Sequence, residues 1–435
     1  MRIQHILIAF YFFFICITCI AYVQTSKKVD ADNTQISYQQ LGIGTDDKLI
    51  IGRDIDLQGG ICELPHGCTI VFKGGIVKNG TLIGKDTKIA GKGVLFDHVN
   101  IKGSWIVPKI STAMFANLTY ENALRDVMAL TSPKIKNHVE IGQGEYTVKA
   151  EKEAGVCISV GSNTELIIRG TIRLMPNDFK RYYIVDVEGR NVSIKGDGCI
   201  IGDKHTHKGK QGEWGMGINI MKSENVKISG LTIKDCWGDC IYVGGNSRNV
   251  GIENCLLDHG RRQGISITSA NNVHIRKCSI TNVGGTAPEY AIDVEPNKGD
   301  VVDNIIIEKV SAKDCIGGFL VYGRAEKARV GLVTIRNCVI DNNKKVAVNV
   351  IKCDMAIIED CLISQQTVQT VIKCEDDSCV VIKNNLYDYK ADVWTDIKMT
   401  AKNLIGKNST RPIVVSKCGK SVVKNNMESK RKANK

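Results

Sequence analysis

The chain has 435 residues and a formal net charge of +12 at pH 7, and 43% of its residues are hydrophobic. Its 42 glycines and only 7 prolines indicate a turn-rich folded protein and exclude a disordered or collagen-like chain. The positive charge favours acidic partners, but aromatic residues make up only 6% of the chain and are not interleaved with basic ones. We therefore predict no nucleic-acid binding.

The first residues have the pattern of an export signal. The short basic start MRIQH precedes a run of about 15 apolar residues, the length of a signal-peptide core and too short for a typical spanning helix. We predict a signal peptide over residues 1–21, cleaved after Ala21, and hence a secreted, periplasmic or cell-surface protein with no stable membrane span. An uncleaved anchor and a lipoprotein are the alternatives, although Thr18 before Cys19 disfavours lipidation.

The remainder divides into four regions by composition. Residues 22–45 are polar and are predicted to form a linker. Residues 46–110 carry strand and turn signals, which indicate a β cap or early coils. The main domain is predicted over residues 111–390, and a C-terminal cap with a basic tail over 391–435.

One amphipathic helix is expected, within residues 116–131. Its shared apolar side consists of Leu118, Ala123, Leu124, Val127 and Met128. Asn117 or Thr119 is the predicted N-cap. We expect this helix to cap the N-terminal end of the main domain.

The main domain contains a repeat. In NVKISGLTI, NVGIENCLL, NVHIRKCSI, NIIIEKVSA, GLVTIRNCVI and MAIIEDCLI, one core position recurs; its residues are Leu231, Cys255, Cys278, Val310, Cys338 and Cys361. The spacing is 23 residues between Cys255 and Cys278 (278 − 255), and between Cys338 and Cys361 (361 − 338). A constant period of this length indicates a solenoid, in which each unit buries its apolar face against the next.

Each unit consists of short strands. Apolar residues alternate, which is strand periodicity, so the units are expected to stack in parallel. Asn225, Asn249, Asn272 and Asn304 open successive units and are predicted to form a ladder at one corner, because Asn tolerates left-handed backbone. A second strand follows in each unit; its predicted inward pairs are Ile241/Val243, Ile265/Ile267, Ile292/Val294, Leu320/Tyr322 and Val348/Val350.

Cysteine usage agrees with this core. Of 17 cysteines, Cys16 and Cys19 lie in the signal segment. Since cysteines alternate with Leu231 and Val310 in the repeated position, we predict that they are small buried residues, stacked and reduced. No cysteine pair has zinc-ligand spacing, and we predict no metal site.

The segments VEIGQGEYTV and NVSIKGDGCIIGD, with the repeats after them, resemble the pectin-lyase-like right-handed parallel β-helix superfamily. The resemblance covers most of residues 110–390 and implies an all-β, right-handed parallel β-helix. It does not define one activity, because the fold hosts lyases, hydrolases, epimerases, adhesins and phage tailspikes.

GDCIYVG, RQGISIT and YAIDVEP resemble the coils in which polygalacturonases carry Asp-Asp-Cys, Gly-His-Gly and Arg-x-Lys. Here the first motif is reduced to Gly238-Asp239, with Asp235 upstream as a candidate second carboxylate. Gln263 stands at the histidine position, and Asp293-x-Glu295 replaces the two bases. The departures argue against ordinary polygalacturonase activity.

Strand alternation places Tyr242, Ser266 and Asp293 in one outward column, with Glu295 in the next. Coils stack about 4.8 Å apart, so Arg262 from the adjacent coil should join them. The predicted catalytic residues are Asp239, Arg262, Asp293 and Glu295. The predicted substrate-binding residues are Asp235, Tyr242, Asp258, His259, Arg261, Tyr322 and Arg324.

Less specific interpretations remain open for these residues. Asp293 and Glu295 could form a solvated face paired with Arg262, which would contribute little. Asp239 could be a turn residue, and His259 an exposed structural one. Arg261 and Arg262 are adjacent on a strand, so one of them needs a buried or anionic partner.

We therefore expect a monomeric enzyme that acts on polysaccharide, as a glycoside hydrolase or a polysaccharide lyase, on an acidic glycan. No cofactor is predicted, except that a lyase could use Ca²⁺. The alternatives are a non-catalytic glycan-binding or cell-surface β-helix protein, and a phage tailspike-like structural repeat.

Overall fold

The computed structural model describes residues 35–37, 43–45, 48–365, 371–376, 378–389, 413–415, 418 and 421–428. The predicted signal peptide and most of the predicted linker and basic tail lie outside these residues. Within the described part of the chain, no helix is long and apolar enough to cross a membrane.

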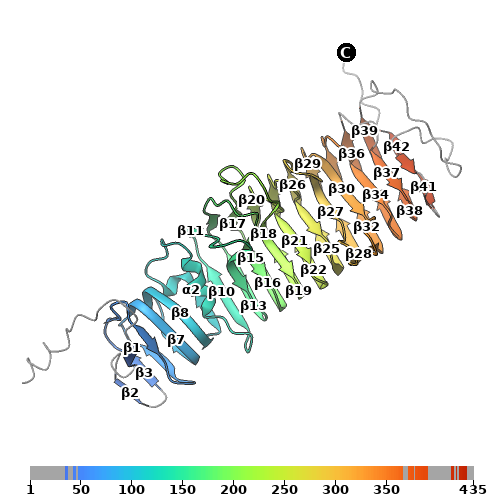
Figure 1. Ribbon diagram of the computed structural model, residues 1–435. Helices are drawn as coiled ribbons and strands as arrows, with labels where there is room; N and C mark the ends of the chain where they lie inside the picture. Colours follow the sequence, from blue (N-terminus) through green and yellow to red (C-terminus); the bar gives the residue numbers. More distant parts are fainter. Residues whose placement is uncertain are drawn as a thin grey trace, which may run out of the picture.

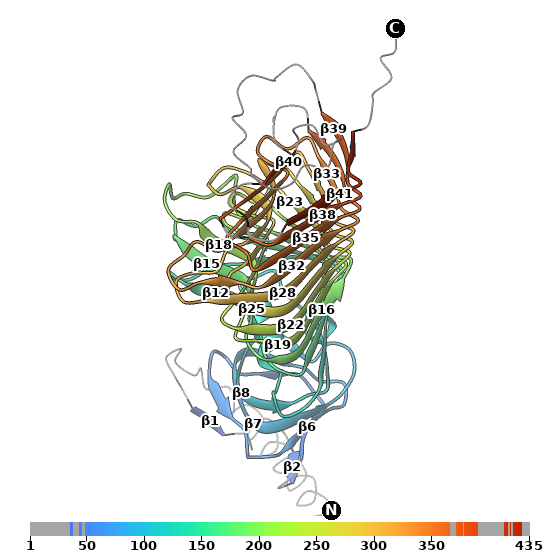
Figure 2. The same ribbon diagram turned by 90° about the vertical axis from the view of Figure 1, so that its right-hand side faces the viewer.

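The protein is an elongated stack of coils, and Figure 1 shows them in chain order along one axis. Each regular coil contributes one strand to each of three parallel sheets, and the view in Figure 2 shows the chain winding around a common core. This is the predicted right-handed parallel β-helix. The core is continuous because the apolar side of each strand packs toward the coil axis.

The first sheet consists of β9 (Lys109–Ser111), β10 (Asn137–Ile141), β13 (Thr164–Ile168), β16 (Arg190–Gly196), β19 (Glu224–Ser229), β22 (Ser247–Glu253), β25 (Ala270–Arg276), β28 (Val301–Glu308), β31 (Arg329–Val330), β32 (Leu332–Arg336), β35 (Met355–Glu359), β38 (Val380–Lys383) and β41 (Ser421–Lys424). The second sheet consists of β11 (Glu145–Val148), β14 (Thr171–Leu174), β17 (Cys199–Ile201), β20 (Thr232–Lys234), β23 (Leu256–Asp258), β26 (Ser279–Thr281), β29 (Ser311–Lys313), β33 (Val339–Asp341), β36 (Leu362–Gln365), β39 (Leu386–Tyr389) and β42 (Met427–Glu428). The third sheet consists of β12 (Gly155–Val160), β15 (Arg181–Val187), β18 (Trp214–Met221), β21 (Ile241–Gly244), β24 (Ile265–Ile267), β27 (Tyr290–Val294), β30 (Gly317–Tyr322), β34 (Val348–Ile351), β37 (Ile372–Glu375) and β40 (Ile413–Val415).

A further sheet precedes the regular coils. It consists of β1 (Gln35–Ser37), β2 (Ile43–Thr45), β3 (Lys48–Ile51), β4 (Ile55–Asp56), β5 (Ile61–Glu63), β6 (Thr69–Phe72), β7 (Val77–Ala90) and β8 (Phe96–Ile106). The long strand β7 pairs in parallel with β4, β5, β6 and β8, so this sheet is also built from stacked turns of the chain.

The amphipathic segment forms a shorter helix than predicted. A 3-10 turn, η2 (Thr112–Met114), precedes α2 (Ala123–Ala129). The predicted N-caps Asn117 and Thr119 are wrong, because Asn122, in left-handed backbone, directly precedes the helix. Asn117 Oδ1 instead accepts a hydrogen bond from the Thr119 backbone. The predicted capping role of the helix stays a prediction.

The Asn ladder is confirmed. Asn225, Asn249, Asn272 and Asn304 all have left-handed backbone, with φ between 53° and 59°. Each side-chain amide donates to the amide oxygen one coil earlier, for example from Asn272 Nδ2 to Asn249 Oδ1 at 2.7 Å. These asparagines lie near the start of β19, β22, β25 and β28, so the ladder fixes the bend of the chain there.

The cysteine column is confirmed as well. Cys255, Cys278, Cys338 and Cys361 are no more than 2% exposed, and none forms a disulfide. In the third sheet, however, the predicted inward pair Leu320/Tyr322 is wrong by one residue. The register pairs Ile292 with Phe319, which faces the core, and Asp293 with Leu320.

The Asn ladder yields a prediction on stability. Asn249→Ala should lower the free energy of unfolding by about 1–2 kcal/mol, because an alanine in left-handed backbone is strained. Asn249→Gly loses the same two amide contacts but tolerates the backbone, so it should be less destabilising. Thermal denaturation of both variants checks this, and equal melting temperatures would contradict the backbone argument.

Candidate functional site

The candidate site lies on the outer side of the third sheet, across β18, β21, β24 and β27. The parallel register aligns Asn219 with Tyr242, Tyr242 with Ser266, and Ser266 with Asp293. This is the column that strand alternation predicted. Its exposure differs from the prediction, because Ser266 and Asp293 are fully buried and Tyr242 is half-buried.

Arg262 connects two carboxylates from different parts of the chain. Its Nη1 donates to Asp239 Oδ2 at 3.3 Å, and its Nε donates to Glu213 Oε2 at 3.1 Å. Asp239 is fully buried, whereas the Arg262 side chain is 15% exposed and that of Glu213 is 40% exposed. Arg262 therefore lies between the surface and Asp239, and it has the anionic partner that the sequence required.

Gln263 fixes the second acid of the site. Its Nε2 donates to Asp293 Oδ2 at 2.9 Å, and its Oε1 accepts from the Tyr290 backbone at 2.7 Å. The side chain thus joins β27 to the turn before β24 and orients the Asp293 carboxyl. The sequence offered no signal for this role beyond the position of Gln263 between Arg262 and Gly264.

The pKa values of the two buried acids are raised. Burial raises the pKa of Asp239 to about 7, although Arg262 counteracts part of the effect. Burial and the neighbouring charge of Glu295 raise the pKa of Asp293 well above its usual value. Asp293 and Glu295 lie within hydrogen-bonding reach, and such a bond forms only when one of them holds a proton.

Arg262 contacts two carboxyl groups, and two more act on its charge. Burial alone would lower the pKa of Arg262, but the acidic groups raise it; they are Asp239, Asp293, Glu213 and Glu295. We call these five residues the carboxyl cluster. The predicted catalytic residues all belong to it, and sequence reasoning missed only Glu213.

The carboxyl cluster retains unused hydrogen-bonding capacity. Within the described residues, the buried atoms Asp239 Oδ1 and Ser266 Oγ have no hydrogen-bond partner. The buried Asp293 Oδ1 has none except the Glu295 carboxyl group. Unsatisfied buried polar atoms are uncommon and destabilise a fold. Three of them in adjacent coils suggest a place where water or ligand hydroxyl groups bind.

Glu213 reaches the cluster from the connection between β17 and β18, residues 202–213. This connection is fixed by a buried contact in which His207 Nδ1 lies 2.8 Å from Asp203 Oδ2. The His207 ring stacks on Trp237 with centroids 3.9 Å apart. Glu213 is distant from the cluster in sequence, so no local pattern could have identified it.

Among the residues that the structure describes, no carboxylate forms an ion pair with Arg261. Its guanidinium lies 3.7 Å from the centroid of Trp237, and Nη1 donates to the carbonyl of Gly212 at 2.9 Å. Arg261 therefore holds the 202–213 connection in place. Its predicted role in substrate binding stays a prediction.

Asp258 ends β23 of the second sheet, Asp235 and His259 directly follow β20 and β23, and all three bond to other residues there. Asp235 faces His205, with Nε2 to Oδ1 at 3.1 Å, and has left-handed backbone. The expectation of Asp235 as a second carboxylate beside Asp239 stays a prediction. Asp258 Oδ2 lies 2.7 Å from His259 Nδ1, so both contribute to the turn instead of the carboxyl cluster.

The remaining predicted binding residues are Tyr242, Tyr322 and Arg324. Tyr242 OH lies 2.7 Å from Thr268 Oγ1 at the end of β24. Val321 pairs with Val294, and Tyr322 and Glu295 are the next residues on the two strands. Tyr322 therefore lies one coil beyond Glu295. Arg324 forms an ion pair with Asp376, and its guanidinium lies 6.0 Å from the Tyr322 ring.

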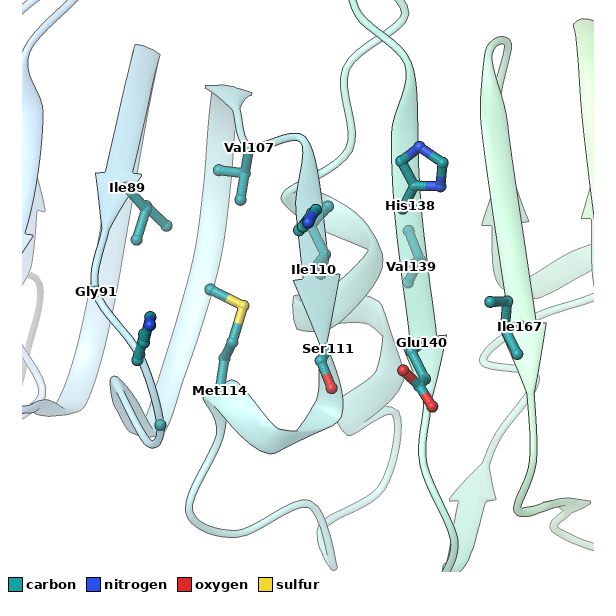
Figure 3. A pocket seen from close by; sticks show the side chains of 13 residues that line it. Ile89, Gly91, Val107, Ile110, Ser111, Met114, His138, Val139, Glu140 and Ile167 are labelled. Carbon is teal, nitrogen blue, oxygen red and sulfur yellow. The ribbon is translucent and has the colours of Figure 1, made fainter.

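A separate pocket of about 420 Å³ lies at the junction of the N-terminal sheet and the first sheet. Figure 3 shows His138 and Glu140 on β10 facing it, with Ile89 and Met114 among the apolar residues. His138 Nδ1 lies 2.6 Å from Glu165 Oε2, and Glu140 accepts from Arg169. Because these groups are engaged and no buried acid faces the pocket, we favour the carboxyl cluster as the chemical site.

The raised pKa of Asp239 predicts a dependence of stability on pH. An unfolded aspartate titrates near 3.8, so the folded state binds the proton more tightly between that pH and about 7. Stability should therefore be highest at the acidic end of this window and fall as the pH rises through it, by about 1.4 kcal/mol for each unit of pKa shift. Asp239→Asn should flatten this fall, measured as melting temperatures at pH 5 and pH 7.5. An unchanged pH dependence would show that Asp239 is not the titrating group.

Residues 144–330 match the family described as right handed beta helix region. The chain is 30% identical over 190 residues to the SPbeta prophage-derived uncharacterized protein YorA of Bacillus subtilis (strain 168), covering 36% of this chain and 32% of that protein. It thus spans about a third of the length of this relative.

Two solved structures are similar in fold. An exopolygalacturonase from Thermotoga maritima aligns with 14% identity and a TM-score of 0.44, over 65% of this chain and 87% of that one. PfbA, a surface adhesin of Streptococcus pneumoniae, aligns with 12% identity and a TM-score of 0.40, over 92% and 93%. Likenesses at this level do not bear on activity. The three parallel sheets and the match over residues 144–330 together show that the chain has the right-handed parallel β-helix fold.

Proposed function

We propose that this protein is an exported glycoside hydrolase that cleaves a polysaccharide at the carboxyl cluster. The observation that carries the proposal is the gathering of four carboxyl groups around Arg262, two of them buried with raised pKa. Glycoside hydrolysis requires a carboxyl group that holds a proton and a carboxylate that accepts one. The cluster offers groups of both kinds within adjacent coils.

We assign the following roles in hydrolysis to the residues of the carboxyl cluster. A water molecule attacks the anomeric carbon and loses its proton to the partly exposed Glu295 carboxylate. The bond from that carbon to the leaving oxygen breaks, and the oxygen takes a proton from Asp239. Asp293 lies within hydrogen-bonding reach of Glu295 and shares a proton with it. Asp239 and Asp293 lie beneath the surface, so the glycan must displace Arg262 from Glu213 to reach them.

Hydrolysis fits the cluster better than elimination does. A lyase must neutralise the carboxylate of a uronic acid with a free cation. Arg262 is already paired with Asp239 and Glu213. In the described residues, no three His, Cys, Asp or Glu side chains are grouped to hold a metal, so Ca²⁺ has no evident ligands there for a lyase reaction.

The net charge of +12 favours a polymer with acidic character overall. The experiment is a screen of the purified protein against acidic and neutral polysaccharides. New reducing ends without the ultraviolet absorbance of unsaturated uronates would support hydrolysis. Absorbance that rises with cleavage would indicate a lyase and contradict the proposal.

A second candidate is a glycan-binding protein without catalysis, of the cell-surface or phage-derived kind. The complete burial of Asp239 and Asp293 favours it, and so does the name of the prophage-derived relative. On this alternative the screen detects no cleavage, but glycan binding is retained and is lost in Arg262→Ala.

A further inference from the structure

The charge balance of the carboxyl cluster constrains the sugar that can bind there. We propose that the ring at the cluster is an uncharged sugar and not a uronic acid, even when the polymer as a whole is acidic. This inference rests on the proposed cleavage at the same site. It concerns the one ring whose bond is broken.

Acidic groups outnumber basic ones in the carboxyl cluster by four to one. With Asp239 and Asp293 both protonated, Glu213 and Glu295 remain, opposed by Arg262 alone. Loss of either buried proton makes the cluster more negative. A uronate carboxylate would add another negative charge in a largely buried place, where repulsion is poorly screened.

Three basic residues of this part of the β-helix form other contacts in the described structure. Arg261 stacks on Trp237 and donates to a backbone carbonyl. Lys345 Nζ binds Glu289 Oε2 at 3.1 Å, and Lys204 Nζ donates to the Gly284 carbonyl at 3.0 Å. None of them can neutralise a uronate at the cluster without breaking these contacts.

An exposed cation, Arg181, lies beside the residue that follows Glu213. The Arg181 guanidinium lies 4.8 Å from the centroid of the Trp214 ring, which directly follows Glu213 in the chain. Trp214 is 39% exposed, so this pair can meet a neighbouring ring of the glycan. An acidic group on that second ring would be attracted there, which reconciles an acidic polymer with an uncharged ring at the cluster.

The unsatisfied atoms of the cluster also suit an uncharged ring. Asp239 Oδ1 and Asp293 Oδ1 can accept hydrogen bonds from sugar hydroxyl groups, and Ser266 Oγ can donate or accept one. A hydroxymethyl group offers a donor where a uronate offers only acceptors. Binding an uncharged ring therefore offers these buried atoms one more donor than a uronate does.

The test compares polymers that differ only in charge. Polygalacturonate, alginate and glucuronan are each paired with their carboxyl-reduced forms, in which every carboxylate becomes a hydroxymethyl group. Cleavage by the full protein is read as reducing ends, and binding as retardation in affinity gels. We expect a reduced form to be cleaved at least a hundredfold faster than its parent polyuronate.

The possible outcomes separate this inference from the proposed hydrolysis. Faster cleavage of a polyuronate than of its reduced form would overturn the inference and leave hydrolysis standing. Tighter binding of a reduced form without any cleavage would support the inference and count against hydrolysis. If the protein neither cleaves nor binds any of the polymers, both are overturned.

A variant of Glu213 provides a second test of the charge argument. Glu213→Gln removes one negative charge and releases Arg262, so it should reduce the preference for the reduced polymer about tenfold. Glu308→Gln is the matched control, because Glu308 pairs with Arg336 and His274 on the first sheet. Its preference should equal that of the parent protein, and an equal shift in both variants would contradict the inference.

Discussion

Asp293→Asn and Glu295→Gln should each lower turnover about a hundredfold or more on the polysaccharide that the screen identifies, the scale expected when a general base, or the carboxyl group that shares its proton, is lost. Both changes keep the shape of the side chain and remove its ability to exchange a proton. Asp293 is fully buried and held by Gln263, while Glu295 is partly exposed beside it. The measurement is kcat and kcat/KM at several pH values.

Glu308→Gln serves as the control for this loss as well, since it removes a partly exposed carboxylate from a different sheet. Its turnover should match that of the parent protein. Melting temperatures of the two site variants should stay close to the parent value, or rise at neutral pH for Asp293→Asn, which removes a buried acid. Full activity in both site variants would show that the chemistry lies elsewhere.

Cys278→Asp should destabilise the protein by several kcal/mol, because it places an unpaired charge inside the coil stack. Cys278 is 2% exposed, and its neighbours in the column are Cys255 and Val310. In a solenoid each coil is supported by its neighbours, so the damage should spread to adjacent coils. Ile265→Asp should behave in the same way, since Ile265 is fully buried.

Ser279→Asp is the matched control for this substitution. Ser279 follows Cys278 directly and is only partly buried, so the same carboxylate would reach solvent there. Hydrogen exchange and thermal denaturation should show little change. A Cys278→Asp protein that melts like the parent would contradict the assignment of that column to the core.

Much of the fold could be predicted because the same sequence pattern recurs in every coil. The spacing of Cys255 and Cys278 defined the coil, and the Asn249 ladder position defined a corner; both agree with the structure. The phase of one strand could not be predicted. In the run FLVY every residue is apolar or aromatic, so alternation does not reveal whether Phe319 or Leu320 faces inward.

The site could be predicted only in part. Alternation brought Tyr242, Ser266 and Asp293 into one column, and coil spacing added Arg262. Burial could not be inferred, because it depends on how Arg262 and the 202–213 connection cover Asp239. Glu213 was missed for the same reason, since its contact with Arg262 is long-range.

The extent of the helix was overestimated because amphipathic spacing does not reveal where a helix begins. The residues that share its apolar side include Leu118, but the helix starts only at Ala123. Asn117 forms a local turn with Thr119 instead. Such side-chain bonds to the backbone compete with helix formation.

The most direct test of the central claim is a crystal structure of Glu295→Gln with an oligosaccharide from the best substrate. We expect a sugar ring over β21, β24 and β27, with its hydroxyl groups bonded to Asp239 or Asp293. Arg262 should be displaced from Glu213. An oligosaccharide bound elsewhere, such as in the pocket beside His138, with the contact between Arg262 and Glu213 intact, would contradict it.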